Sequence, residues 1–215
     1  MSLASYTDLT AAVGNYMARS DLTAFIPDFV TQTEAMMNRM VRTPDMEAST
    51  SPTLTSGTAS LPSDFLEWIS LTWTNGTRTI DLRFVEADSE EWRIRYRPSL
   101  DPQQFAIIAD KISIRPVVTG TITFNYYQQI PALITNNTNW MMTKHPDIYL
   151  SLSLFFANVF VMNDERAQEL FGLAQDQMNK ADLLSDSAKL ALRGNPAVVE
   201  RDELGQARNI QAGAV

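Results

Sequence analysis

The spacing of apolar residues changes twice along the chain, and this change constrains the fold more than any other feature of the sequence. Near the N-terminus, Leu9, Val13 and Met17 recur at helical spacing, and so do the apolar residues of 29–41. From about residue 46 to about residue 140, threonine and serine become common and apolar residues alternate over short runs, which is typical of strands. Helical spacing returns at Ile148. These patterns predict an α+β protein.

The order of these patterns also predicts how the chain is divided. Helices at both ends and strands between them indicate a discontinuous helical bundle, into which an antiparallel β module is inserted. We place the helical domain at 1–45 and 141–189 and the β module at 46–140. Residues 190–215 are predicted to form an extended C-terminal arm, which becomes ordered when a partner receives it.

Several residues predict where the helices begin and end. Thr7 is the expected N-cap of the first helix, and Pro27 and Pro146 suit the first turns of two others. A last amphipathic helix is predicted to run to about Lys189. The helix after Pro146 has a broad apolar face, which we expect to pack in the core: Ile148, Leu152, Phe155, Phe156, Val159 and Phe160.

The middle of the chain shows hairpin and core signals. Asn75-Gly76 and Asp110-Lys111 each separate two alternating runs and predict tight turns. A short helix is expected at 86–93. We also expect Phe65 and one of the two tryptophans, Trp68 and Trp73, to be mostly buried.

Composition excludes several kinds of chemistry. The chain has 215 residues, no cysteine and a single histidine, His145. Disulfides, thiolate metal sites and mechanisms that need two imidazoles are therefore excluded. Phosphate loops, dinucleotide fingerprints and hydrolase elbows are also missing from the sequence. We expect no catalytic site, no metal and no cofactor.

The formal net charge of −8 bears on nucleic acid and membranes. Free binding to DNA normally needs a basic face, whereas an acidic surface suits a channel through which DNA slides without sticking. The most apolar stretch, 148–162, is shorter than the roughly 20 residues of a membrane-spanning helix. The N-terminus lacks the basic and apolar pattern of a signal peptide. We expect no membrane association.

Three groups of residues are candidates for contacts with partners. The first contains Met36, Met37 and Met40, which suit either an adaptable interface or the core. The second contains Arg93, Arg95 and Arg97, which alternate with aromatic and apolar residues. This stripe suits nucleic acid, but an exposed strand face, or ion pairs with a neighbouring subunit, fits the acidic chain better. The third lies in the arm and contains Val198, Val199, Leu204 and Ile210.

An acidic cluster and the lone histidine have ordinary explanations beside functional ones. The cluster is formed by Glu86, Asp88, Glu90 and Glu91. It could bind a hard cation, but it lacks the spacing and the glycine of an EF-hand, and a solvated first helical turn explains it as well. His145 precedes a proline, where a capping or loop role is common.

Four segments, taken in order, resemble one protein family. They are Tyr6-Thr7-Asp8-Leu9 with Arg19-Ser20-Asp21-Leu22; Ile26-Pro27-Asp28-Phe29 to Asn38-Arg39; Leu61-Pro62-Ser63-Asp64-Phe65-Leu66-Glu67; and Tyr126-Tyr127 through Ile130-Pro131-Ala132-Leu133 and Asn139-Trp140 to Pro146-Asp147-Ile148-Tyr149-Leu150. They span about residues 6–185 and resemble the head-to-tail adaptor, or head-completion, proteins of tailed phages, especially short-tailed ones. The arm, 190–215, lies outside this resemblance.

The resemblance implies a structural virion protein that assembles in the host cytoplasm and lies at the head–tail interface. Copies are expected to form a ring, of twelve by resemblance, with the portal protein on one side and tail or nozzle proteins on the other. Genomic DNA would pass through the lumen without specific binding. The alternatives are a tail or baseplate binding module and, less favoured, a DNA-processing or cell-wall-degrading enzyme.

Overall fold

The computed structural model describes residues 3–93 and 101–184, and it divides the chain into two compact units. The helical unit combines Met1–Thr43 with His145–Val215, and the β unit is Pro44–Lys144. One unit is built from helices and the other mainly from strands, so the predicted α+β class is confirmed. The short helix α5 (Trp140–Lys144) falls in the β unit, whereas we expected residues from 141 onward in the helical domain.

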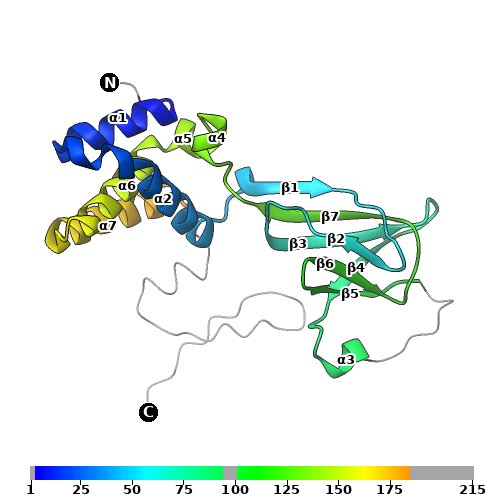
Figure 1. Ribbon diagram of the computed structural model, residues 1–215. Helices are drawn as coiled ribbons and strands as arrows, with labels where there is room; N and C mark the ends of the chain where they lie inside the picture. The colour runs from blue at the N-terminus through cyan, green and yellow to red at the C-terminus, as the bar shows by residue number, and fades with distance from the viewer. Residues whose placement is uncertain (1–2, 94–100, 185–215) are drawn as a thin grey trace, which may run out of the picture. The chain divides into compact units, whose positions relative to one another are not determined.

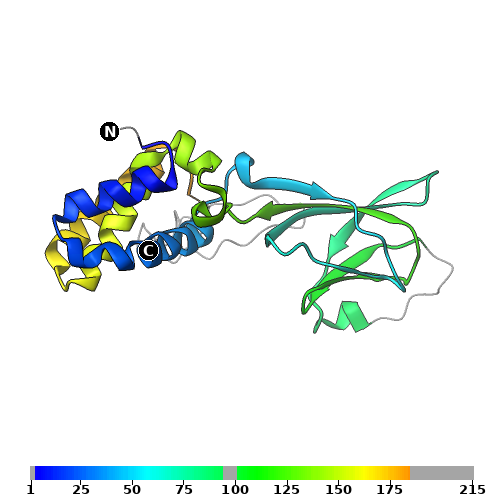
Figure 2. The same ribbon diagram turned by 45° about the horizontal axis from the view of Figure 1, so that its top comes forward.

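The helical unit is arranged around α6 (Pro146–Phe160). Helices α1 (Tyr6–Met17), α2 (Ile26–Met40) and α7 (Asp164–Lys180) all pack on α6, and the 3-10 helix η1 (Ser20–Phe25) leads into α2. Figures 1 and 2 show α6 among these helices from two directions. Because α6 contacts three other helices, it supplies the largest share of this core.

The first helix begins two residues earlier than predicted. Ser5, not Thr7, is the N-cap, and its hydroxyl accepts a hydrogen bond from the backbone N–H of Asp8 at 3.2 Å. The Asp8 carboxylate in turn accepts a hydrogen bond from the backbone N–H of Ala4 at 3.2 Å, so side chains satisfy backbone N–H groups on both sides of this helix start. The predicted positions of the two prolines are confirmed, because Pro27 and Pro146 both lie in the first turns of their helices.

The last helix ends earlier than the predicted Lys189. Helix α7 ends at Lys180, and Asp182 follows in the left-handed region with a φ of 52°. The N–H of Leu183 then bonds to the carbonyl of Met178 at 3.0 Å, as in a Schellman motif. This turn brings Leu184 into an isolated antiparallel bridge with Val41, and both side chains are buried. The burial gained there explains why the helix stops.

The β unit contains one seven-stranded sheet in the order β1-β7-β3-β4-β5-β6-β2. Its strands are β1 (Glu47–Thr50), β2 (Thr58–Ser60), β3 (Phe65–Thr74), β4 (Thr79–Phe84), β5 (Gln104–Ile108), β6 (Lys111–Arg115) and β7 (Thr121–Gln128). The remaining short elements are η2 (Pro44–Met46), α3 (Glu90–Arg93) and α4 (Leu133–Asn136).

The expectation of a wholly antiparallel module was wrong at one strand pair. Strands β4 and β5 are parallel, through Arg83 opposite Gln104 and Phe84 opposite Phe105. A parallel pair needs a crossover of a dozen or more residues, and the connection between Phe84 and Gln104, which contains α3, is long enough. The expected short helix over 86–93 is confirmed in its second half.

Both predicted hairpins are present. Strands β3 and β4 pair through Leu71 with Leu82, and β5 and β6 pair through Phe105 with Ile114. In the first hairpin, Gly76 has a φ of 89°. The Asn75 side-chain oxygen accepts hydrogen bonds from the backbone N–H groups of Thr77 and Arg78, each at 3.0 Å. The Asn75 backbone N–H also donates to the Arg78 carbonyl at 3.3 Å, so both the side chain and the backbone of Asn75 close the turn.

Aromatic residues form the core of the β unit, and Phe65 and one of the two tryptophans contribute to it, as expected. Trp73 is buried, but Phe65 and Trp68 are only partly buried. The fully buried rings are Phe105 and Phe124. Phe65 stacks on Phe124 with ring centroids 5.7 Å apart, so it covers the core rather than lying inside it.

Candidate assembly surface

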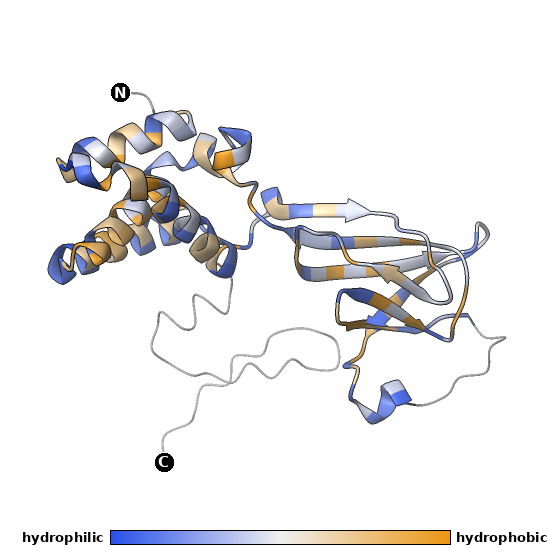
Figure 3. Cartoon of the chain, in the orientation of Figure 1, coloured by the Kyte–Doolittle hydropathy of each residue, from blue (hydrophilic) through white to orange (hydrophobic). Residues whose placement is uncertain are grey.

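Large apolar side chains that remain exposed are concentrated in the helical unit. Within the described residues nine such side chains are exposed, and six of them belong to this unit: Tyr16, Phe25, Val159, Phe160, Met162 and Leu173. Scattered exposed apolar residues need no explanation, but a contiguous group marks an interaction site. Figure 3 shows the apolar residues along α6 and on part of α7.

The apolar face predicted for α6 is only half covered. Ile148 and Leu152 are fully buried, but Phe155 and Phe156 are partly buried and Val159 is 46% exposed. These residues lie at i, i+4, i+7, i+8 and i+11, so they form one stripe along the helix. The side chains of the stripe are therefore buried in the N-terminal half of α6 and partly or largely exposed to solvent in its C-terminal half.

The expectation that this whole face lies in the core was thus wrong, and the reason is packing. The buried side of α6 includes small polar residues, and Ser153 lies 3.4 Å from the Thr33 hydroxyl on α2. Asn158 is also buried, and its side-chain N–H donates to the carbonyl of Leu154 at 2.8 Å. Small side chains let neighbouring helices approach closely, so the bulky phenylalanines are displaced to the margin.

Ring contacts join the exposed residues into two groups, and these groups are neighbours on α6 because Phe156 and Phe160 lie four residues apart. Phe155 packs against Phe156 and Phe171, with centroid distances of 4.8 and 5.2 Å. Phe160 packs against Phe25 at 5.0 Å and against the buried Phe29 at 5.5 Å. We call the following set the aromatic surface: Phe25, Phe155, Phe156, Val159, Phe160, Met162 and Phe171.

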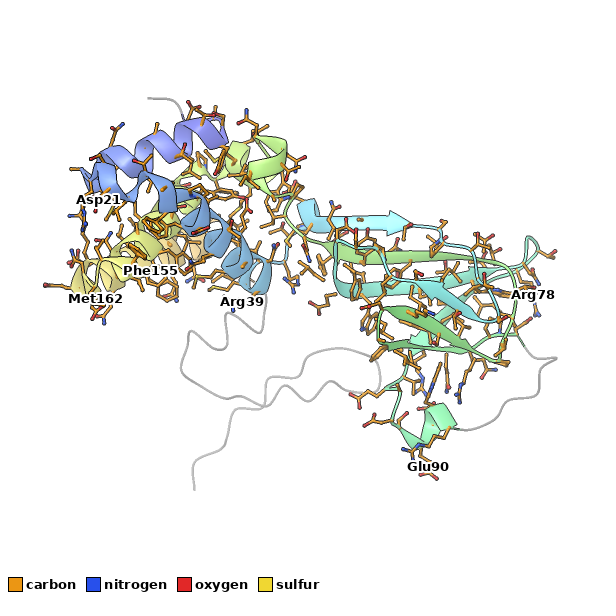
Figure 4. All side chains as sticks on the ribbon, in the orientation of Figure 1. Asp21, Arg39, Arg78, Glu90, Phe155 and Met162 are labelled. Carbon is orange, nitrogen blue, oxygen red and sulfur yellow. The ribbon has the colours of Figure 1, made fainter. Side chains whose placement is uncertain are left out.

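Met162 is the most prominent member of the aromatic surface. It is 88% exposed and occupies the turn between α6 and α7 with a φ of 56°. Figure 4 shows Phe155 and Met162 on the same side of the helical unit, where α6 and α7 meet. A flexible thioether in this position suits contact with a partner whose shape is not fixed in advance.

Acidic residues border this surface at the start of α7. Asp164, Glu165 and Glu169 are exposed there, against one exposed basic residue, Arg166. The local charge is therefore negative.

A separate, locally neutral pair lies at the start of η1. Arg19 donates two hydrogen bonds to Asp21, from Nε at 3.1 Å and from Nη2 at 2.5 Å. These bonds lower the pKa of Asp21 and raise that of Arg19. Both side chains are well exposed, so water screens this pair and it adds little to stability.

The three methionines singled out from the sequence differ in exposure. Met37 is fully buried in the helical unit, whereas Met36 and Met40 are partly buried. Core filling, one of the two readings of this group, therefore accounts for Met37.

The basic-aromatic stripe is described only at its beginning. Trp92 and Arg93 lie on α3, with Trp92 buried and Arg93 exposed, while Arg95 and Arg97 fall outside the described residues. The basic residue that contacts the tryptophan is Arg115 of β6, whose guanidinium carbon lies 4.4 Å from the ring centroid. It also donates to the Trp92 carbonyl. Sequence spacing gave no signal for this pair, because 23 residues separate the partners.

Val198, Val199, Leu204 and Ile210 of the arm fall outside the described residues.

In the acidic cluster, Glu91 pairs with Arg83 and accepts a hydrogen bond from Gln104 at 2.8 Å. His145 is the N-cap residue of α6 without a capping bond from its side chain.

The described residues show neither a metal-binding cluster nor a membrane-spanning helix. Within 3–93 and 101–184, His, Asp and Glu side chains do not come together in any group of three that could hold a metal ion. Over the same residues, every helix is too short or too polar to cross a membrane.

Comparison with known proteins identifies the family. The model of the SU10 adaptor protein family matches residues 4–199, which is most of the chain. No curated protein matches the chain. The match extends past residue 190, so the first part of the arm lies inside it, contrary to our expectation. The chain therefore belongs to the SU10 adaptor protein family, in agreement with its resemblance to phage head-to-tail adaptors.

Proposed function

We propose that this chain is a ring-forming adaptor that docks beneath the portal of a phage and connects the head to the tail. Family membership supports a structural role in the virion. The observation that carries the ring is the aromatic surface, because an exposed surface of this kind on a virion component fits contact with another subunit. A ring of identical copies uses two different patches of each subunit in a head-to-tail interface that closes.

The proposal includes passage of DNA through the ring. Each copy adds a formal charge of −8. A lumen lined by acidic residues repels phosphates, so DNA would slide through without specific binding. We propose twelve copies, the number expected from the resemblance to portal-bound adaptors, with tail or nozzle proteins on the side away from the portal.

The arm completes the proposed docking. Residues 194–215 contain a few scattered apolar residues, among them Val198, Val199, Leu204 and Ile210. These apolar residues are too few to form a core of their own. Burial against the portal or a neighbouring subunit would remove them from water and stabilise the arm. Further candidate contacts of the ring are Met36, Met40, Arg93, Arg95 and Arg97.

We further propose that the chain has no catalytic activity, since its family is one of structural adaptors. His145 is the only imidazole, so His145→Ala should leave ring assembly unchanged while the thermal melt stays that of the parent. A defined turnover that disappears in His145→Ala, with the fold preserved, would contradict this part of the proposal.

The direct test of the ring is to mix the purified chain with the portal protein of the same phage and to image the product. We expect rings coaxial with the portal and of the same rotational symmetry. Chain that stays unbound, or a single copy at the tip of the tail, would contradict the proposal.

A further inference from the structure

Within the proposed ring, we infer that residues 189–193 of a neighbouring copy cover the aromatic surface of each helical unit. This inference rests on the proposed function and names the partner of one surface. The segment reads Lys-Leu-Ala-Leu-Arg and begins five residues after Leu184, the last residue that the structure describes.

The aromatic surface is apolar and largely exposed. Its stripe on α6 continues a face whose first half, at Ile148 and Leu152, is fully buried. Val159, Phe160 and Met162 are 46, 50 and 88% exposed, so burying them removes much apolar area from water. An occupant therefore needs apolar side chains of its own.

The charges around the surface select among the possible occupants. Asp164, Glu165 and Glu169 outnumber Arg166 at the start of α7, so the occupant should carry basic groups beside its apolar residues. Residues 189–193 fit this requirement, with Leu190 and Leu192 between Lys189 and Arg193.

The rest of the arm fits less well. Among its charged residues, Glu200, Asp202 and Glu203 outnumber Arg201 and Arg208. The segment 189–193 also lies inside the family match, which ends at residue 199. The basic segment is therefore the part of the chain beyond Leu184 that best complements the acidic border.

Chain length favours a neighbouring copy over the same chain. Leu184 is held beside Val41, near the end of α7 that lies opposite Met162. The 17 residues of α7 span about 25 Å, and Met162 lies beyond its first residue. Six residues, fully extended, bring Leu190 only about 20 Å from Leu184. Within one chain Leu190 therefore falls short of Met162, and Leu192, at most about 28 Å from Leu184, reaches it only when the chain between them is fully extended. A neighbouring copy can place both leucines on the surface without this restriction.

The absence of cysteine from the sequence allows a direct test by disulfide trapping. The double variant Met162→Cys/Leu190→Cys is assembled with the portal protein and oxidised, and the product is run on a non-reducing gel. Contact between neighbours links each copy to the next, so we expect a ladder of covalent multimers. The matched control is Leu173→Cys/Leu190→Cys, because Leu173 is also exposed on α7 but lies outside the aromatic surface. It should give no ladder.

Each other result overturns the inference in a distinguishable way. A monomer that migrates faster, with both thiols consumed, shows that the segment folds back on its own chain. Rings visible by microscopy without a ladder leave the adaptor function standing and refute the contact. Absence of rings from the same sample refutes the proposed function, and this inference fails with it.

A charge-reversal experiment tests the same contact without cysteine. Lys189→Glu/Arg193→Glu should weaken ring formation about tenfold, since exposed ion pairs contribute up to about 1 kcal/mol each. Adding Asp164→Lys/Glu165→Lys should restore most of the loss. If the four-residue variant assembles no better than the first, the acidic border does not meet this segment.

Discussion

Phe25 and Phe160 pack with ring centroids 5.0 Å apart, yet 41 and 50% of their respective surfaces remain exposed. The same Phe160 ring lies 5.5 Å from Phe29, which is buried. The aromatic surface is therefore built directly on the core of the helical unit, and its outer residues are held in place by inner ones.

This relationship predicts different costs for two similar substitutions. Phe29→Ala should lower the free energy of unfolding by about 3–5 kcal/mol, because it leaves a cavity in the core. Phe25→Ala should cost only about 1 kcal/mol, since it removes one ring contact at the surface. Urea denaturation of both variants measures the difference. Equal losses would mean that Phe25 belongs to the core and that the aromatic surface ends before it.

A second prediction concerns two glycines with positive φ in the β unit. At Gly120, with a φ of 143°, an added Cβ would lie 2.6 Å from Nε1 of Trp73 and 2.9 Å from the Thr74 carbonyl oxygen. At Gly76, with a φ of 89°, an added Cβ would meet nothing within 4 Å. Gly76→Ala should therefore cost about 1 kcal/mol for the backbone conformation alone.

Gly120→Ala should cost clearly more than its matched control, because the backbone or the buried tryptophan must also move. Thermal melts of the two variants, with tryptophan fluorescence to follow Trp73, provide the measurement. Melting temperatures that coincide would contradict the close approach of β7 to Trp73.

The pH dependence of stability follows from Tyr126. Its hydroxyl donates a hydrogen bond to Asp64 at 3.0 Å. Burial, together with this bond and the negative charge of Asp64, raises the pKa of Tyr126 above its ordinary value near 10. The folded state thus holds the proton more tightly than the unfolded state. The resulting stability is complete below the unfolded pKa and is lost as pH rises through the folded pKa.

We therefore expect the free energy of unfolding to fall as pH rises above about 10, and less steeply in Tyr126→Phe. Urea denaturation at several pH values between 8 and 11 measures these slopes. Tyr16→Phe is the control for the loss of a phenol at an exposed position, because Tyr16 is 62% exposed. The same slope in Tyr126→Phe and the parent would refute this role of the Asp64 bond.

Local sequence signals predicted the starts of the elements better than their ends. Pro27, Pro146 and the Asn75-Gly76 turn act through the backbone of adjacent residues, and each lies where expected. The end of α7 depends instead on Leu184 meeting Val41, a contact between distant parts of the chain. The parallel pairing of β4 with β5 likewise depends on the path of a long crossover, which apolar spacing does not reveal.

The candidate surface was only partly predictable for a similar reason. The apolar stripe of α6 was visible in the sequence, but nothing in its spacing shows that Ile148 is covered and Val159 is not. Coverage depends on where α1, α2 and α7 pack. Met37 is the opposite case. Its place in the sequence suits either an interface or the core, and the structure buries it.

Removing the arm should weaken assembly without lowering the stability of the chain. Deleting residues 194–215 should leave the thermal melt of the isolated chain nearly unchanged, because those residues have too few apolar side chains for a core of their own. The same deletion should weaken attachment to the portal, measured by co-sedimentation. A much lower melting temperature, or attachment with the affinity of the parent, would show that the arm is not a docking element.

We propose that this chain closes into a ring at the portal. Electron microscopy of the purified chain mixed with its portal protein is the most direct test. We expect a ring of adaptor copies coaxial with the portal, with twelvefold symmetry and an open lumen. A single copy bound at the tip of the tail, or a portal that remains bare at saturating adaptor, would contradict it.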